Sequence, residues 1–191
     1  DGTVEHWELA VKFYLGTGDV SNPDNWHGPD PSDTLALKIN RMTSHQLRLS
    51  QHPAGRQLLE QKGWNVQRAR SLVKGRLFHP YQSFCLQQFP IPLNVNPGHA
   101  KGWWLTDAQF ALQPELKRGN FVILERSNWL APLSSAENAP IMDHHQMVSF
   151  LSGIDTKGTV PVAQLNGDGA ELSRGFVAFP QWLHDIDAQK V

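Results

Sequence analysis

VEHWELAVKFYL, residues 4–15, alternates apolar and polar side chains with a period of two. Because neighbouring residues on a strand point to opposite sides, this pattern predicts a strand with one apolar and one polar face. The apolar face holds Trp7, Leu9, Val11, Phe13 and Leu15, and the polar face holds His6, Glu8, Ala10, Lys12 and Tyr14. On alternation alone, the simpler interpretation is a half-buried strand whose polar face meets water or forms an ion pair. The alternative is that a carboxylate and an amine on one face hold a metal ion and an anionic substrate together.

The composition suits a packed, water-soluble protein. The 191 residues are 40% hydrophobic and 18% charged, which is typical of a folded domain. No apolar run reaches the length of a membrane span and no secretory leader is visible, so we expect a cytoplasmic protein without a membrane partner. The single cysteine, Cys85, excludes an internal disulfide and a cysteine-rich zinc site. The chain starts at Asp1 and enters a strand almost at once, so we expect a fragment whose N-terminal part is missing.

Charge is strongly segregated along the chain, although its total is only −1. The stretch from Lys38 to Arg76 holds nine basic residues and one acidic residue, Glu60, and so carries +8. The rest holds eight basic and seventeen acidic residues and carries −9. Such segregation creates a local positive field whatever the total, and it suits a nucleic-acid partner. The alternative is a set of solvated helix faces that happen to be basic.

A helix should follow the Gly-, Pro- and Asp-rich loop at 16–31. Ser32 or Asp33 can cap it, and the apolar stripe of this helix has Gln46 at a position where a hydrophobic residue is expected. A buried amide without partners costs on the order of 1–3 kcal/mol, so Gln46 should have a definite hydrogen-bond partner.

Two further helices are predicted, from Pro53 to Lys62 and over 66–74, followed by an extended segment over 77–86. Pro and Gly residues at 87–102 mark the boundary between an N-terminal domain, 1–88, and a mixed α/β subdomain, 89–191. Strands are expected at 102–105, 120–125, 160–165 and 175–179. The fold class is therefore α/β (α+β).

The first strand and its following helix resemble the PD-(D/E)XK nuclease-like superfamily, whose core carries an acid-x-lysine strand followed by a helix that often bears a glutamine. More closely, HWELAVKFYL, WHGPDPSDTLALK, HQLRLS and HAKGWW resemble an uncharacterised bacterial family, a domain of unknown function with remote similarity to that superfamily. The closer resemblance runs from Glu5 to Trp182, and the superfamily resemblance covers about the first 50 residues. It implies a partial restriction-endonuclease-like core over 1–88.

The resemblance implies a role for each matching residue. Lys12 would position the attacking water or stabilise charge on phosphorus, Glu8 would bind Mg²⁺, and Gln46 would orient the lysine, the water or a phosphate. The reaction would be phosphodiester hydrolysis. Nucleic acid would be held by basic residues of the +8 segment, namely Lys38, Arg41, Arg48, Arg68, Arg70 and Lys74.

The sequence departs from the superfamily pattern at two points. The residue two before Lys12 is Ala10 instead of an acid, and the upstream acidic residue would precede Asp1. The chain therefore carries half a metal site, and the expectation is little or no activity. Three hypotheses follow: an Mg²⁺-dependent nuclease-like enzyme, an inactive nucleic-acid-binding module on the same scaffold, and a protein-binding scaffold without a nucleic-acid role.

Overall fold

A single eight-stranded mixed sheet runs through the computed structural model, which describes residues 4–133, 139–156 and 158–189. Its strands are β1 (Val4–Gly16), β2 (Trp26–His27), β3 (Val66–Pro80), β4 (Ala100–Thr106), β5 (Asn120–Ile123), β6 (Met142–Asp143), β7 (Thr159–Leu165) and β8 (Glu171–Ala178). Their order across the sheet is β2-β1-β3-β4-β8-β7-β5-β6. The pairs β1/β3, β3/β4 and β4/β8 are parallel, and the other pairs are antiparallel.

The helices complete a mixed α/β fold, as the sequence predicted. They are α1 (Leu35–Ser44), α2 (Pro53–Gln61), α3 (Tyr81–Cys85), α4 (Asp107–Leu112), α5 (His144–Gly153) and α6 (Pro180–Ala188), with short 3₁₀ turns that include η2 (Gln46–Gln51). None of the described helices has the length and apolar character that a membrane crossing needs. The sheet continues across the predicted boundary at 88/89 through the β3–β4 ladder, and the division into two domains stays a prediction.

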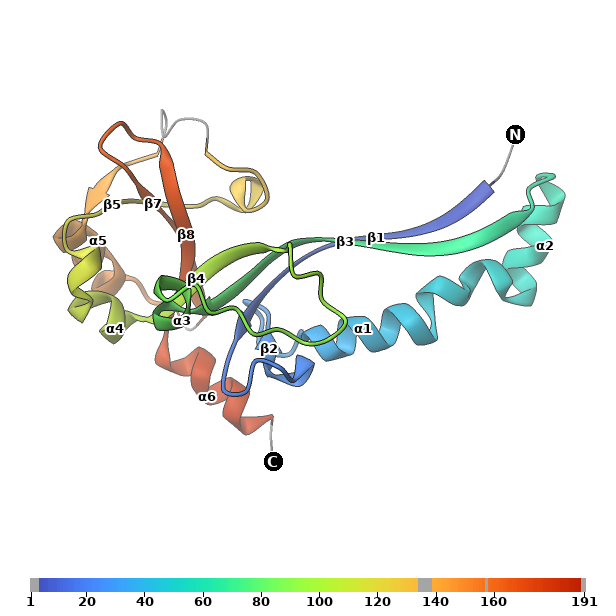
Figure 1. Cartoon of the computed structure of the whole chain (residues 1–191), viewed down its shortest axis with the longest axis horizontal. Helices are drawn as coiled ribbons and strands as arrows, with labels where there is room; N and C mark the ends of the chain where they lie inside the picture. Colours follow the sequence, from blue (N-terminus) through green and yellow to red (C-terminus); the bar gives the residue numbers. More distant parts are fainter. Residues whose placement is uncertain (1–3, 134–138, 157, 190–191) are drawn as a thin grey trace.

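The outer halves of β1 and β3 leave the body of the molecule as a long two-stranded ribbon (Figure 1). Residues 4–12 of β1 pair with 66–75 of β3, and β2 joins β1 only at Leu15 and Gly16. The segment α1–η2–α2 connects the two strands and lies along one side of the ribbon (Figure 1). We call the ribbon with these helices the arm.

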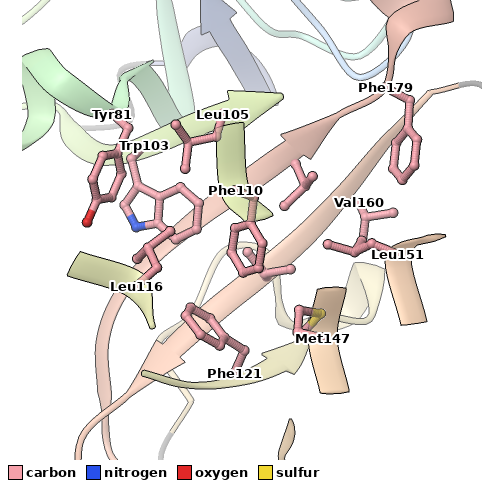
Figure 2. Packing of buried hydrophobic residues seen from close by; sticks show 12 residues of the cluster. Tyr81, Trp103, Leu105, Phe110, Leu116, Phe121, Met147, Leu151, Val160 and Phe179 are labelled. Carbon is pink, nitrogen blue, oxygen red and sulfur yellow. The ribbon is translucent and has the colours of Figure 1, made fainter. Parts of the chain in front are cut away.

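The hydrophobic core lies at the other end of the molecule. Trp103 of β4, Phe110 of α4, Phe121 of β5 and Met147 of α5 are fully buried against one another on one face of the sheet (Figure 2). In a second cluster, Trp182 of α6 packs with strand residues that include Leu15 and Phe176. The arm therefore projects from a well-packed body that holds the inner ends of β1 and β3 in place.

The predicted helix over 66–74 is wrong, because this segment forms the outer half of β3. Its apolar residues Ala69, Leu72 and Val73 fall at helical spacings of three and four, but the ladder to β1 imposes the period of a strand. The extended segment predicted over 77–86 is partly right, since β3 ends at Pro80 and α3 follows.

Two details of the first predicted helix are also corrected. Thr34, and neither Ser32 nor Asp33, caps α1 by accepting a hydrogen bond from the Leu37 amide. The helix ends at Ser44, so Gln46 begins η2 instead of lying on the α1 stripe.

In the arm, helices cover the polar face of β1 and leave its apolar face exposed, the opposite of what is usual for an amphipathic strand. Along the arm, the polar face lies against α1 and η2, whereas Trp7, Leu9 and Val11 on the apolar face are exposed. Farther along β1, Leu15 is fully buried, so only the outer part of the apolar face is open.

Candidate functional site

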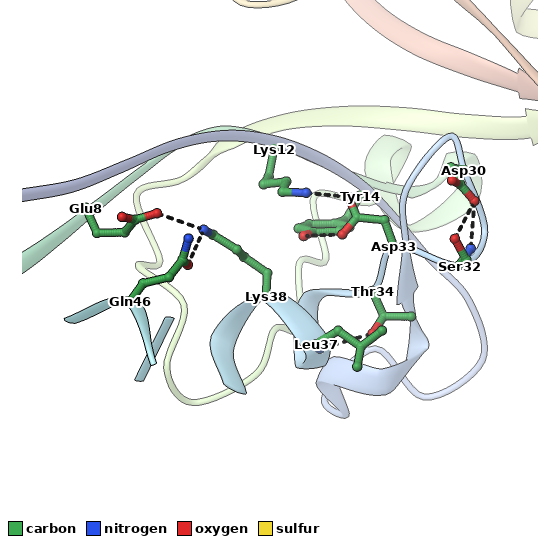
Figure 3. A network of polar contacts seen from close by, with 10 residues as sticks. All are labelled: Glu8, Lys12, Tyr14, Asp30, Ser32, Asp33, Thr34, Leu37, Lys38 and Gln46. Atoms are coloured by element: carbon green, nitrogen blue, oxygen red, sulfur yellow. Dashed lines mark hydrogen bonds and ion pairs between the residues drawn. The ribbon is translucent and has the colours of Figure 1, made fainter. Parts of the chain in front are cut away.

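Several side chains on the polar face of β1 contact the helical side of the arm, and Figure 3 draws those of Glu8, Lys12 and Tyr14. His6 lies 3.2 Å from the Ser50 hydroxyl of η2, and Glu8 and Lys12 contact residues at the start of the α1 region. The alternation that predicts a polar strand face therefore places these side chains between the strand and the helices. The strand and helix together build the site.

Lys12 is paired with a carboxylate that lies outside β1. Its Nζ donates to Oδ2 of Asp33 at 2.6 Å, and Asp33 lies in the loop that leads into α1. The Tyr14 hydroxyl, on the same strand face, donates to Oδ1 of Asp33 at 3.4 Å. Burial and the Asp33 charge raise the pKa of Tyr14, so its hydroxyl stays protonated and acts as a donor. Lys12 and Asp33 are each about one third exposed, so the pair remains open to water and to a competing anion.

Glu8 and Gln46, the other two residues predicted to be catalytic, both contact Lys38 of α1. Its Nζ donates to Oε1 of Gln46 at 3.0 Å and lies 3.5 Å from the Glu8 carboxylate. The Lys38 side chain is only 9% exposed, which explains why the ammonium group has two oxygen partners. Gln46 thus has the definite partner that its position requires, and that partner is Lys38 instead of Lys12.

A pocket of about 520 Å³ opens between the polar face of the ribbon, α1 and the segment before β4. Lys12, Tyr14 and Lys38 line it together with Ser71 of β3 and His99. Among the described residues no carboxylate lines this pocket, although Asp33 contacts Lys12 and Glu8 contacts Lys38 from outside the lining. Lys74, at the outer part of β3, also borders the pocket. Ammonium, hydroxyl and imidazole groups around such a space are donors suited to a phosphate or another oxyanion.

The imidazole of His99 joins the pocket to a buried histidine. Nε2 of His99 lies 3.2 Å from Nε2 of His79, and Nδ1 of His99 lies 3.0 Å from the Asn96 carbonyl oxygen. Since that carbonyl can only accept, His99 carries its proton on Nδ1, and His79 donates from Nε2 to His99. Nδ1 of His79 is then a buried acceptor without a partner among the described residues. Burial, followed by the charges of His99 and Lys101, lowers the pKa of His79 to about 4.

The side chains predicted to be catalytic do not by themselves form a magnesium site. Mg²⁺ takes six oxygen ligands, of which proteins supply carboxylates. Glu8 is the one carboxylate among the residues predicted to be catalytic, and it is paired with Lys38. Within the described ranges, no three His, Cys, Asp or Glu residues lie together in a way that could hold a metal ion. We therefore derive no chemical step through a metal, and Mg²⁺ binding stays a prediction.

The six residues predicted to contact nucleic acid lie on two opposite sides of the arm. Lys38, Arg41 and Arg48 belong to the α1–η2 side. In the ladder, Arg70 lies beside Trp7, and Arg68 and Lys74 lie two and four residues away, so alternation places all three with the apolar face of β1. Lys38 is nearly buried, whereas the other five are exposed. A nucleic acid bound to one side of the arm therefore cannot contact both groups of basic residues.

Asp33 is the functional candidate that sequence reasoning missed. The sequence suggested it only as a helix cap, and its distance of 21 residues from Lys12 gave no signal of contact. His79 is a second, because the extended segment predicted over 77–86 gave no sign of which of its residues would be buried.

The fold and this site define a mixed α/β protein with a lysine-lined pocket on a projecting sheet arm. A family model for a domain of unknown function, DUF1853, matches residues 1–178, and the chain belongs to that family. No curated protein and no solved structure matches this chain.

Proposed function

We propose that this domain binds nucleic acid, and that the pocket between β1, β3 and α1 receives a backbone phosphate. The observation that carries the proposal is the pocket itself, where Lys12 and Lys38 share a lining in which the described residues include no carboxylate. A phosphate in the pocket would compete with Asp33 for the partly exposed Lys12. The exposed Arg41 and Arg48 lie on the same side of the arm and would contact neighbouring phosphates.

Binding measured against salt concentration tests this proposal. A labelled oligonucleotide, single- or double-stranded, DNA or RNA, should bind at low salt, and its affinity should fall steeply as NaCl increases. Arg41→Gln with Arg48→Gln should reduce the slope of log K against log [salt] by roughly 1.4–1.8, because each phosphate contact contributes about 0.7–0.9. The matched control is Lys117→Gln with Arg118→Gln, two exposed cations beside β5. Absence of binding at low salt, or equal effects of the two pairs, would contradict the proposal.

A second candidate function is phosphodiester hydrolysis. One observation favours it: Glu8, Lys12 and Gln46 all lie on the polar side of the arm (Figure 3). Glu8 and Gln46 both contact Lys38, whereas Lys12 belongs to a separate group of contacts with Asp33 and Tyr14. Lys12, the one of the three that lines the pocket, would stabilise charge on the phosphate oxygens.

Cleavage assays separate this candidate from simple binding. Supercoiled plasmid and labelled RNA are incubated with the protein in MgCl₂ or in EDTA. Hydrolysis predicts cleavage in MgCl₂ that Lys12→Ala abolishes while the circular dichroism spectrum is unchanged. Salt-dependent binding without cleavage would contradict hydrolysis and support nucleic-acid binding without catalysis.

A further inference from the structure

The exposed side of the β1–β3 ribbon is an organised apolar surface, which we call the open face. It consists of Glu5, Trp7, Leu9, Val11, Arg68, Arg70, Leu72 and Lys74. Leu9 is 66% exposed and Val11 is 51% exposed, although both stand in the middle of a strand. Trp7 is held in place, since its Nε1 donates to Glu5 at 3.0 Å and the Arg70 guanidinium lies 5.7 Å from its ring centroid. The open face therefore presents a row of apolar side chains to water, of which Trp7 is held by polar contacts.

Parallel sheets are rarely left in this state. Because their crossover connections place helices on the faces, parallel strands are nearly always covered on both sides. In this protein α1, η2 and α2 cover one side of the parallel β1–β3 ribbon, and the described chain places nothing on the open face (Figure 1). A helix packed across β1 and β3 on the open face would supply the cover that parallel strands normally have on their second side.

The charges of the open face indicate the chemistry of that helix. Arg68 and Lys74 lie at the two ends of the β3 side, and neither forms an ion pair among the described residues. The one acidic residue of the open face, Glu5, lies beside Arg68 in the ladder and is paired with Arg70 at 3.3 Å, so the face keeps a net positive charge. The β1 side carries only apolar groups from Trp7 to Val11. A complementary helix would therefore have an apolar stripe over β1 and Leu72, with acidic side chains beside it over β3.

We propose that the open face binds an amphipathic helix, apolar on one side and acidic beside it, supplied by a partner polypeptide. A second copy of this chain suits the face less well, because it would oppose the same unpaired cations. Nucleic acid also suits it less well, because Leu9, Val11 and Leu72 offer aliphatic surface where bases need aromatic rings for stacking. The proposal concerns a different surface from the phosphate pocket, which lies between the polar face of the ribbon and α1, and Lys74 is the one open-face residue that also borders that pocket.

Peptide binding to the intact chain tests this proposal. The probe is a labelled 18-residue helical peptide with a leucine stripe flanked by glutamates, and its partner probe has lysines in place of the glutamates. Fluorescence anisotropy should show that the acidic peptide binds at least about tenfold more tightly than the basic peptide. Leu9→Ser should weaken binding of the acidic peptide by about tenfold or more, because it removes a side chain that the helix would bury.

Leu172→Ser is the matched control, since Leu172 of β8 is the same residue type and is 63% exposed. It should leave peptide affinity unchanged, and both serine variants should keep the thermal midpoint of the wild type. Equal binding of the two peptides, no binding of either, or equal effects of the two variants would overturn the proposal. So would a dimer in sedimentation that Leu9→Ser dissociates, which would assign the face to a second copy. Loss of single-stranded oligonucleotide binding in Trp7→Ala would assign it to nucleic acid.

Discussion

Lys12, which lines the pocket from β1, and Asp33 of the loop before α1 form a 2.6 Å ion pair. The carboxylate neutralises the cation that the proposed phosphate contact needs. Binding of a polyanion therefore has to displace Asp33 or share Lys12 with it. This relationship makes Asp33 a negative regulator of affinity in the proposed function.

Asp33→Asn should strengthen nucleic-acid binding. Removing the carboxylate frees Lys12, so affinity at low salt should rise and the salt slope should steepen by about one. The free energy of unfolding should fall by no more than about 1 kcal/mol, because the pair is partly exposed. Oligonucleotide titrations over a series of NaCl concentrations measure the change in affinity and slope, and urea unfolding measures the change in stability.

Asp30→Asn is the control for this prediction, because Asp30 lies in the same loop and accepts its hydrogen bonds from Ser32 instead of a lysine. An equal gain in affinity from both substitutions would show that total charge, and not the contact with Lys12, determines the effect.

The Glu8–Lys38 ion pair of the arm should have a larger coupling energy than the more exposed Glu5–Arg70 pair. The side chains of Glu8 and Lys38 are 19% and 9% exposed, whereas those of Glu5 and Arg70 are 29% and 45% exposed. A double-mutant cycle with Glu8→Gln and Lys38→Met should give a coupling energy of about 1–3 kcal/mol, because each single change leaves its partner's polar group in a partly buried position. The cycle with Glu5→Gln and Arg70→Met should give about 0–1 kcal/mol. Urea unfolding measures all the variants, and coupling energies in the reverse order would contradict this account of the network.

The polar face of β1 could be predicted from the sequence because a period of two is a local property. Its neighbours could not be predicted, since Lys12–Asp33 and Glu8–Lys38 join residues 21 and 30 positions apart and depend on where α1 lies. The need of Gln46 for a partner followed from the energetics of a buried amide, but the helix that should carry it ends two residues earlier.

The error at 66–74 has a different origin. Isolated, the segment satisfies helical spacing, and only pairing with β1 makes it a strand. The same error concealed the open face, because Arg68, Arg70 and Lys74 were placed on a helix instead of beside Trp7, Leu9 and Val11.

Gly75→Ala should distort the ribbon where Lys12 is held. Gly75 has φ +139°, lies directly opposite Lys12 in the ladder, and has no room for a side chain, since a Cβ there would overlap the Lys12 carbonyl oxygen. The substitution combines backbone strain with a clash against main chain, so unfolding free energy should fall by about 3 kcal/mol or more. Gly63→Ala provides the control, because φ is +68° there but no atom lies within 4 Å of the added Cβ. It should cost about 1 kcal/mol. Equal losses in thermal or urea unfolding would show that the contact with Lys12 has no role.

The buried His79 should make stability depend on pH in acid. Its folded-state pKa is about 4, below the value of about 6.5 for an unfolded histidine, so the unfolded chain binds more protons between these two values. The stabilisation is complete above pH 6.5 and is lost as the pH falls to 4, by on the order of 3 kcal/mol.

His79→Gln removes the titrating group, so the difference in unfolding free energy between wild type and variant should shrink as the pH falls through this window. His145→Gln, at an exposed position of α5, should leave the pH profile of the wild type unchanged. Parallel profiles for wild type and His79→Gln would show that His79 is not the group whose protonation opposes folding.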